Sequence, residues 1–182
     1  MFHSYRAIYA GSFDPPTLGH LWMINEAINI FPRILVAVGE NKSKNPMFSV
    51  GARIEMLREL CDAESDAEKV DVVSFKDKYL VDFAQETQAE FIIRGIRSNA
   101  DYEYESVMHE VNMNIQDLEV SEKYAKNPIS TIFLMPPKNL SMVSSSMVKA
   151  LIGPNGWQKI VRKYVPEIVL EQLKKKYAKQ NS

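Results

Sequence analysis

The sequence contains one cysteine in 182 residues, which excludes an intramolecular disulfide and a metal cluster held by several cysteines. It has no stretch of about 18 consecutive apolar residues, and no segment combines the basic start and apolar run of a signal peptide. The formal net charge of -1 argues against a dedicated nucleic-acid or membrane-surface protein. We therefore expect a cytoplasmic protein that binds neither nucleic acid nor membrane.

Apolar residues are plentiful by comparison, and they recur in patterns that predict secondary structure. Hydrophobic residues make up 46% of the chain, which is enough to fill the core of one domain over residues 1–182. The expected strands are residues 5–10, 33–38, 70–75, 90–94 and 130–135. The expected helices begin near residues 18 or 19, 50, 79, 101, 145, 157 and 166, so the C-terminal part is helical. This alternation predicts an α/β fold with a Rossmann-like, doubly wound sheet of about five parallel strands.

The first expected strand ends in a turn that can bind phosphate. The segments Gly11-Ser12-Phe13-Asp14-Pro15 and Thr17-Leu18-Gly19-His20 lie between this strand and the first helix. The first turn of a helix has unpaired N–H groups and the positive end of the helix dipole, so it favours phosphate. His20 adds a side-chain donor, whose protonation state the sequence leaves open. Asp14 follows the turn, and we expect it to orient backbone.

Further polar residues follow the other expected strands. Lys44 comes after the second strand, Arg94-Gly95-Ile96-Arg97 ends the fourth, and Ser144-Ser145-Ser146 follows the fifth. Each feature alone is also typical of surface arginines, helix caps or turns. In doubly wound folds, however, ligands bind beyond the carboxyl ends of the strands, and guanidinium groups suit phosphate oxygens. Together the segments predict a phosphate-binding site at one edge of the sheet.

The combination of these segments resembles the signature of the pantetheine-phosphate adenylyltransferases, a family of the nucleotidylyltransferase superfamily. The resemblance includes Thr17 in place of a first histidine, the Asp101-Tyr102-Glu103-Tyr104-Glu105 segment after Arg97, and Pro46-Met47-Phe48 after Lys44. It extends over nearly the whole chain. It implies transfer of an adenylyl group from ATP to 4′-phosphopantetheine, which gives dephospho-CoA and pyrophosphate in coenzyme A biosynthesis.

The resemblance also implies roles for individual residues. His20, Lys44 and Arg97 would be catalytic, with His20 stabilising the transition state. ATP would contact Ser12, Phe13, His20, Gly95, Ile96, Arg97, Glu105, Leu140, Ser141, Met142, Val143, Ser144, Ser145 and Ser146, and the acceptor would contact Ser12, Lys44, Leu80 and Arg94. Mg²⁺ would be bound mainly through the ATP phosphates, because the motifs contain no clear set of carboxylate ligands. The protein would form a homohexamer.

Two departures from the family and two alternative functions remain open. Leu140 stands where an aromatic residue is frequent, and residues 115–129 form a span about ten residues longer than expected. A related nucleotidylyltransferase would use nicotinate mononucleotide or a phosphorylated polyol, and a nucleotide sensor would keep the fold without turnover. His3, His109 and Cys61 are expected to have no role in the site.

Overall fold

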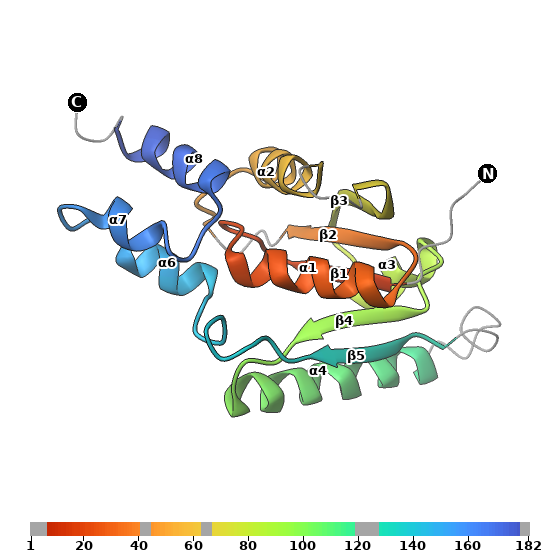
Figure 1. Cartoon of the computed structure of the whole chain (residues 1–182). Helices are drawn as coiled ribbons and strands as arrows, with labels where there is room; N and C mark the ends of the chain where they lie inside the picture. Colours follow the sequence, from red (N-terminus) through yellow and green to blue (C-terminus); the bar gives the residue numbers. More distant parts are fainter. Residues whose placement is uncertain (1–6, 41–44, 63–66, 119–127, 179–182) are drawn as a thin grey trace.

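The computed structural model describes residues 7–40, 45–62, 67–118 and 128–178. Its centre is a five-stranded sheet in which all neighbouring strands are parallel, in the order β3-β2-β1-β4-β5 (Figure 1). The strands are β1 (Ala7–Gly11), β2 (Ile34–Glu40), β3 (Val70–Lys76), β4 (Phe91–Gly95) and β5 (Ser130–Leu134). The predicted α/β fold is therefore confirmed, and the strand order reverses between β1 and β4, as in a doubly wound sheet.

Helices connect the strands as the periodicity predicts. They are α1 (Leu18–Ile30), α2 (Val50–Asp62), α3 (Leu80–Glu86), α4 (Asn99–Leu118), α6 (Ser145–Leu151), α7 (Trp157–Val161) and α8 (Glu167–Ala178), with a 3₁₀ turn at Ala67–Lys69. The boundaries differ from the predicted ones by a few residues, since caps and tertiary contacts decide where a helix ends. The predicted strand residues 5 and 6 lie outside the described part of the chain.

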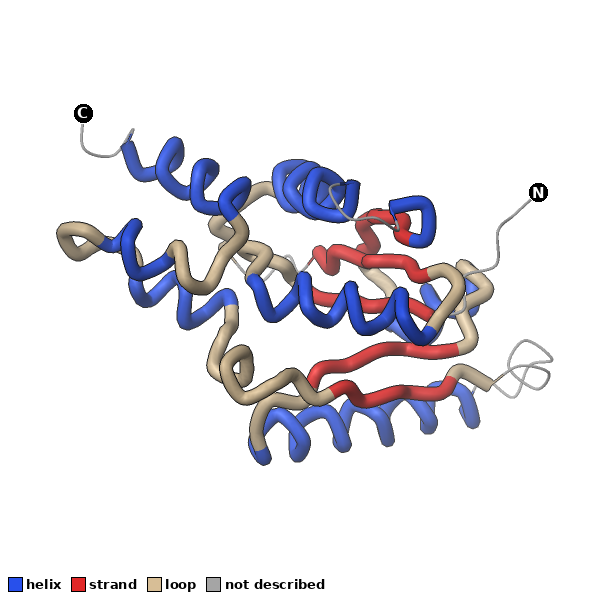
Figure 2. Tube along the Cα trace, viewed as in Figure 1, coloured by secondary structure: helices blue, strands red, loops and turns tan. Residues whose placement is uncertain are grey.

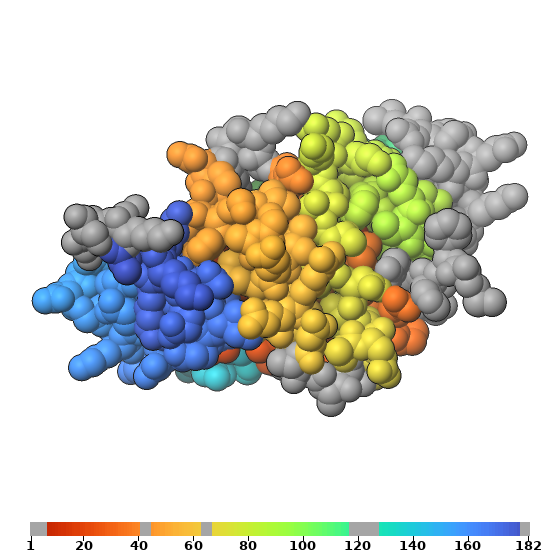
Figure 3. Space-filling view, turned by 90° about the horizontal axis from the view of Figure 1, so that it is seen from above, coloured from red at the N-terminus to blue at the C-terminus, as the bar shows by residue number. Residues whose placement is uncertain are grey.

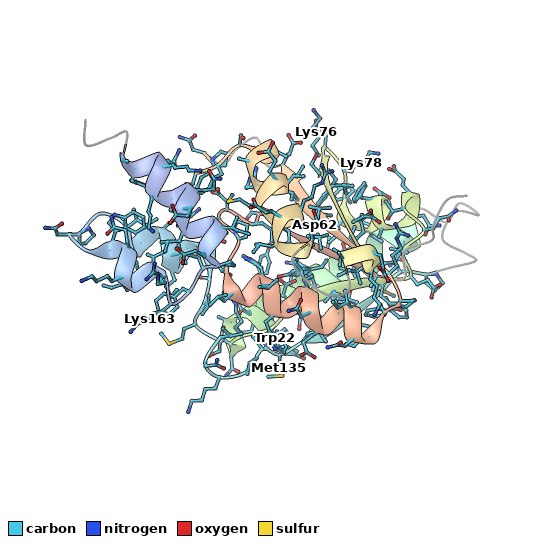
Figure 4. All side chains as sticks on the ribbon, turned by 45° about the horizontal axis from the view of Figure 1, so that its top comes forward. Trp22, Asp62, Lys76, Lys78, Met135 and Lys163 are labelled. Atoms are coloured by element: carbon cyan, nitrogen blue, oxygen red, sulfur yellow. The ribbon has the colours of Figure 1, made fainter. Side chains whose placement is uncertain are left out.

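Alternate side chains of the strands fill two cores on opposite faces of the sheet. Tyr9 and Val36 belong to a core covered by α1 and α2, whereas Ile8 and Leu35 belong to a core covered by α3 and one end of α4 (Figure 2). Trp22, labelled in Figure 4, packs against the first core from α1. Continuous apolar strands such as β1 and β2 are buried on both faces, which is typical of a parallel sheet.

The C-terminal helices form a third core beyond the carboxyl ends of the strands. Met56 and Leu60 of α2 pack there with Val161 of α7 and Leu173 of α8. Figure 3 shows α8, in blue, directly against α2, in orange. The backbone N–H of Leu18 also donates to the carbonyl of Tyr164 at 2.9 Å. These contacts hold the C-terminal helices beside the first turn of α1.

Candidate active site

A cavity of about 300 Å³, called the main cavity below, lies at the carboxyl ends of β1 and β4, where the strand order reverses. Many of the predicted site residues line this main cavity: Ser12, His20, Arg94, Gly95, Arg97, Glu105, Leu140, Val143, Ser144, Ser145 and Ser146. Three of the four predicted segments, which are far apart in the sequence, therefore meet at one edge of the sheet, and the fourth, at Lys44, lies outside the described residues.

The other predicted residues do not line the main cavity. Phe13 is fully buried, Ile96 is 7% exposed, and Met142 is 80% exposed. The hydroxyl of Ser141 donates to the carbonyl of Lys138 at 2.8 Å. Buried side chains such as Phe13 and Ile96 support the main cavity without lining it. Lys44 lies outside the described residues, and Leu80 borders a separate cavity described below.

His20 is held by the cap of its own helix. Thr17 is the N-cap of α1, and its backbone N–H donates to Nδ1 of His20 at 3.0 Å. The Thr17 hydroxyl lies 3.0 Å from the same nitrogen and accepts from the His20 backbone N–H at 3.4 Å. Because the backbone N–H can only donate, Nδ1 is an acceptor, and Nε2 carries the hydrogen of the neutral ring. His20 is thus a neutral donor with a fixed tautomer.

The surroundings of His20 also favour the neutral ring. Burial lowers the pKa of His20, and the nearby charge of Arg97 lowers it further, from 6.5 to about 4. The ring packs edge-on against Phe13, with 5.0 Å between ring centroids. The imidazole is therefore neutral at physiological pH and can stabilise developing negative charge as a hydrogen-bond donor.

Two glycines permit the close approach of segments around His20. A Cβ atom on Gly19 would lie 3.3 Å from the carbonyl oxygen of Val143. A Cβ atom on Gly11 would lie 3.2 Å from the ring of Phe13. A larger residue at position 19 would push the start of α1 away from the segment before α6, and one at position 11 would displace the Phe13 ring. The glycines therefore help to close the walls of the main cavity.

Arg94 is oriented by a bidentate ion pair with Glu105 of α4. Nε of Arg94 donates to one carboxylate oxygen of Glu105 at 2.7 Å, and Nη2 donates to the other. Nη1 donates to the carbonyl of Ala10 at 3.0 Å. Burial disfavours the charged guanidinium, yet the hydrogen bonds and charge of Glu105 outweigh this effect and raise the pKa of Arg94. Arg94 is therefore a permanently charged and preoriented cation.

Arg97 forms a second bidentate pair, with Asp101. Nε and Nη2 of Arg97 each donate to a carboxylate oxygen of Asp101 at 3.0 Å, and the Arg97 backbone N–H also donates to this carboxylate at 3.0 Å. Nη1 reaches the carbonyl of Val143 at 3.3 Å. Burial raises the pKa of Asp101, but the hydrogen bonds from Arg97 outweigh it, so the pKa is lowered. Asp101 thus orients Arg97 across the main cavity.

The three serines before and in α6 have different environments. Ser144 is the N-cap of α6, and its hydroxyl accepts from the backbone N–H of Met147 at 3.1 Å. The Ser145 hydroxyl donates to the carbonyl of Pro15 at 2.8 Å, which ties α6 to the turn after β1. Ser146 borders both the main cavity and a third cavity. The serines therefore join the two segments as well as lining the site.

A second cavity, of about 160 Å³, adjoins the main cavity and shares Arg94 and Glu105 with it. Its other walls are mostly apolar or aromatic, and they include Leu80, Tyr104, Met108 and Val111, with Asn112 as a polar group. His109 also borders the second cavity, although the sequence predicted no role for it. Leu80 and Arg94, predicted to bind the acceptor, thus lie on one cavity wall.

A third cavity, of about 140 Å³, shares Ser12, Ser145 and Ser146 with the main cavity. Asp14 borders it, and its carboxylate accepts from the backbone N–H groups of Met47 and Phe48, both at 2.8 Å. The predicted role of Asp14 in orienting backbone is confirmed. Because these N–H groups belong to the segment before α2, Asp14 fastens that segment to the turn after β1.

Sequence reasoning missed two cations on the wall of the third cavity. Lys149 lies one turn into α6, with Nζ 3.3 Å from the Asp14 carboxylate. Its position four residues after Ser145 could have indicated that it lies near the serines. Arg53 of α2 is 3% exposed. No local pattern indicates its place, since it lies 41 residues from its contact, Ser12.

The two departures from the family pattern are resolved in part. Leu140 is half-buried on the wall of the main cavity. Within the long span 115–129, α4 continues to Leu118, and residues 119–127 lie outside the described chain. The Gln116 side chain accepts from the Ile129 backbone N–H at 2.7 Å and donates to its carbonyl at 3.2 Å. This pair of bonds fastens together the described ends of the span.

The parallel sheet, the reversal of strand order and the cationic cavity define a Rossmann-like α/β protein with a site suited to phosphate groups. A family model described as cytidylyltransferase-like matches residues 8–151. The chain is 45% identical to the phosphopantetheine adenylyltransferase of Chromobacterium violaceum, over 96% of this chain and 99% of the relative. It is 44% identical to that of Neisseria meningitidis serogroup C, over 97% of this chain and 96% of the relative. The chain therefore belongs to the phosphopantetheine adenylyltransferase family.

A more distant structure supports the fold. Plasmodium falciparum nicotinic acid mononucleotide adenylyltransferase, solved in complex with NaAD, aligns over 95% of this chain and 96% of its own, with a TM-score of 0.65 and 17% identity. Among the described residues, no helix is long and apolar enough to cross a membrane. The same part of the chain contains no group of three or more His, Cys, Asp or Glu side chains that could hold a metal ion.

Proposed function

We propose that the protein transfers the adenylyl group of ATP to 4′-phosphopantetheine, forming dephospho-CoA and pyrophosphate. The observation that carries this proposal is the position of Arg94, which borders both the main cavity and the second cavity. One preoriented guanidinium is thus available to a phosphate in either space. The names and high identity of the relatives support the same reaction.

The two cavities suit the two substrates. The main cavity is polar and cationic, and its volume of about 300 Å³ is at the lower end of typical ligand pockets. It would hold ATP between His20, Arg97 and the serines. The second cavity has the Arg94–Glu105 pair on its wall, together with apolar and aromatic side chains and the amide of Asn112. It would hold the phosphate of 4′-phosphopantetheine near Arg94 and the pantetheine arm against Leu80 and Met108.

The chemistry requires two polyanions to come together, so electrostatic repulsion is the main obstacle. An oxygen of the acceptor phosphate attacks the α-phosphorus of ATP, and the bond from that phosphorus to the bridging oxygen breaks as pyrophosphate leaves. The acceptor phosphate is already ionised at neutral pH, so no general base is needed. Arg94 and Arg97 offset the repulsion and align the groups, while the neutral His20 donates to the α-phosphate as its charge changes.

Two further components complete this mechanism. Lys44, which lies outside the described residues, would supply a third cation to the acceptor phosphate. Mg²⁺ would enter with ATP, bound mainly through phosphate oxygens and water, and would supply charge neutralisation. The acidic residues of the main cavity suit this mode of binding, because Glu105 is engaged by Arg94 and neighbouring Asp101 by Arg97. Activity in EDTA titrations should fall with free Mg²⁺ and recover when Mg²⁺ is restored.

We further propose that the protein is a homohexamer, and the surface of α4 supports this. Tyr104 is 61% exposed, Val107 62% and Val111 39%, and their spacing puts them on one face of the helix. Tyr104 and Val111 also border the second cavity, so a second copy on this face would help to enclose the acceptor. Sedimentation equilibrium should give six chains per particle, and a monomer at micromolar concentration would contradict the proposal.

A cytoplasmic location fits the same function. The reaction consumes ATP, and the single cysteine, Cys61, is buried and has no second cysteine in the chain with which to form a disulfide. Fractionation of the native organism with an antibody against the protein should therefore recover it with cytoplasmic markers. Recovery with an envelope fraction would contradict this location.

The activity is tested by measuring pyrophosphate release with a panel of acceptors. ATP and CTP are each offered with 4′-phosphopantetheine, nicotinate mononucleotide and a phosphorylated polyol. ATP with 4′-phosphopantetheine should be the productive pair, and mass spectrometry should identify dephospho-CoA. Equal or faster turnover of nicotinate mononucleotide would support a related nucleotidylyltransferase instead. ATP binding without pyrophosphate release from any pair would support a nucleotide sensor.

A further inference from the structure

Arg53 is a buried cation in a helix that contributes no residue to the wall of the main cavity. It lies in the first turn of α2 and is 3% exposed. Its Nη1 donates to the carbonyl of Ser12 at 2.6 Å, and its Nε donates to the carbonyl of Ser49 at 3.4 Å. In the described part of the chain its partners are carbonyl oxygens rather than a carboxylate. Its hydrogen bonds therefore hold backbone in place instead of forming an ion pair.

The contact with Ser12 falls at the most constrained point of the turn after β1. Phe13, the next residue, has a φ of 47°, in the left-handed region that bulky residues rarely adopt. Its side chain is fully buried and packs against the rings of Tyr9 and His20. A rotation of the peptide between Ser12 and Phe13 would therefore disturb the residue that supports His20. By binding the Ser12 carbonyl, Arg53 opposes this rotation.

The same contact sets the direction of a backbone donor. The carbonyl of Ser12 and the N–H of Phe13 belong to one planar trans peptide, so they point in opposite directions. With the carbonyl held against α2, the N–H of Phe13 points away from that helix. Phe13 is fully buried, so the orientation of this peptide also sets the place of the Phe13 ring behind His20.

We propose that Arg53 is a positioning residue of the nucleotide site: by holding the Ser12 carbonyl it fixes the Ser12–Phe13 peptide, and with it Ser12 on the wall of the main cavity and the Phe13 ring that packs against His20. This inference rests on the proposed adenylyl transfer. Other hydrogen bonds hold the flanking parts of the turn: the Ser145 hydroxyl donates to the carbonyl of Pro15, and the Asp14 carboxylate accepts from backbone N–H groups of the segment before α2. Arg53 acts on the peptide that precedes both.

The test compares Arg53→Met and Arg53→Lys with a matched control on the same helix, Arg58→Met. Arg58 also donates to a carbonyl, with Nη2 3.0 Å from the oxygen of Val72, but it lies away from the three cavities. Arg53→Met should lower kcat about 10- to 100-fold. This is less than the loss when a preorganised donor is removed altogether, because the variant disturbs the support of His20 and leaves His20 itself in place. Arg53→Lys keeps one donor and should retain more activity. Arg58→Met should keep the wild-type kcat.

The readouts separate positioning from stability and from the proposed reaction. Wild-type turnover of 4′-phosphopantetheine, measured in parallel, establishes the reaction independently of the variants. Calorimetry should give weaker ATP binding to Arg53→Met and an unchanged Kd for 4′-phosphopantetheine. If Arg53→Met does not fold, Arg53→Lys decides, with a lowered kcat expected. A wild-type kcat and ATP affinity in the folded Arg53 variants would overturn the inference. A lowered Tm with a normal kcat would also overturn it, because that is the pattern expected of Arg58→Met.

Discussion

Replacing His20 by alanine is expected to lower kcat about 10²- to 10³-fold, or about 2.7–4 kcal/mol of transition-state stabilisation. This is the usual loss when one preorganised hydrogen-bond donor is removed, and the structure shows that the His20 ring has one such donor. Thr17 donates its backbone N–H to Nδ1 at 3.0 Å, so Nε2 carries the single hydrogen of the neutral ring. KM for either substrate should change less, because the charge on the α-phosphate oxygens changes most in the transition state.

The assay is steady-state pyrophosphate release, with kcat and both KM values determined for wild type, His20→Ala and His20→Gln. Glutamine is neutral and keeps an N–H donor, so it should retain more activity than alanine if donation is the role of His20. Circular dichroism and urea unfolding establish that each variant is folded. A kcat near the wild-type value in folded His20→Ala would refute the role. Loss of the cooperative unfolding transition would instead indicate a core histidine.

Three further predictions concern ligand assignment and stability. Arg94→Ala should mainly weaken the binding of 4′-phosphopantetheine, and Arg97→Ala should mainly weaken the binding of ATP. Calorimetric titrations in which each variant mainly loses affinity for the other ligand would contradict the assignment. Asp14→Asn should lower the free energy of unfolding in urea by about 1–3 kcal/mol, because the carboxylate accepts two backbone N–H groups at 2.8 Å; an unchanged value would rule out this role. The pKa of His20 is lowered from its ordinary value of 6.5, which applies to the unfolded chain, to about 4 in the folded protein. Between these two pH values the unfolded chain therefore binds more protons than the folded protein. Stability should therefore fall between pH 6.5 and 4, and this part of the pH dependence should be absent from His20→Gln.

Local patterns in the sequence determined the elements of the fold and much of the site. Residues 34–38 of β2 form a continuous apolar run because both faces of a parallel sheet are covered, and α1 begins directly after the cap Thr17. Since parallel strands that alternate with helices end at the same edge of the sheet, the order of the polar segments predicted that His20 and Arg97 would meet.

The tertiary structure decided which groups face one another. Glu105 was expected to contact ATP, and the fold brings its carboxylate onto Arg94, 11 residues earlier in the chain. Arg53 contacts Ser12 across 41 residues, because the first core packs Leu57 of α2 with Phe13 of the turn after β1. The protonation of His20 was open from the sequence, and it follows from burial and from the Thr17 bond. Such contacts depend on the path of the whole chain, since local periodicity specifies which face of an element is buried but not which side chain it meets.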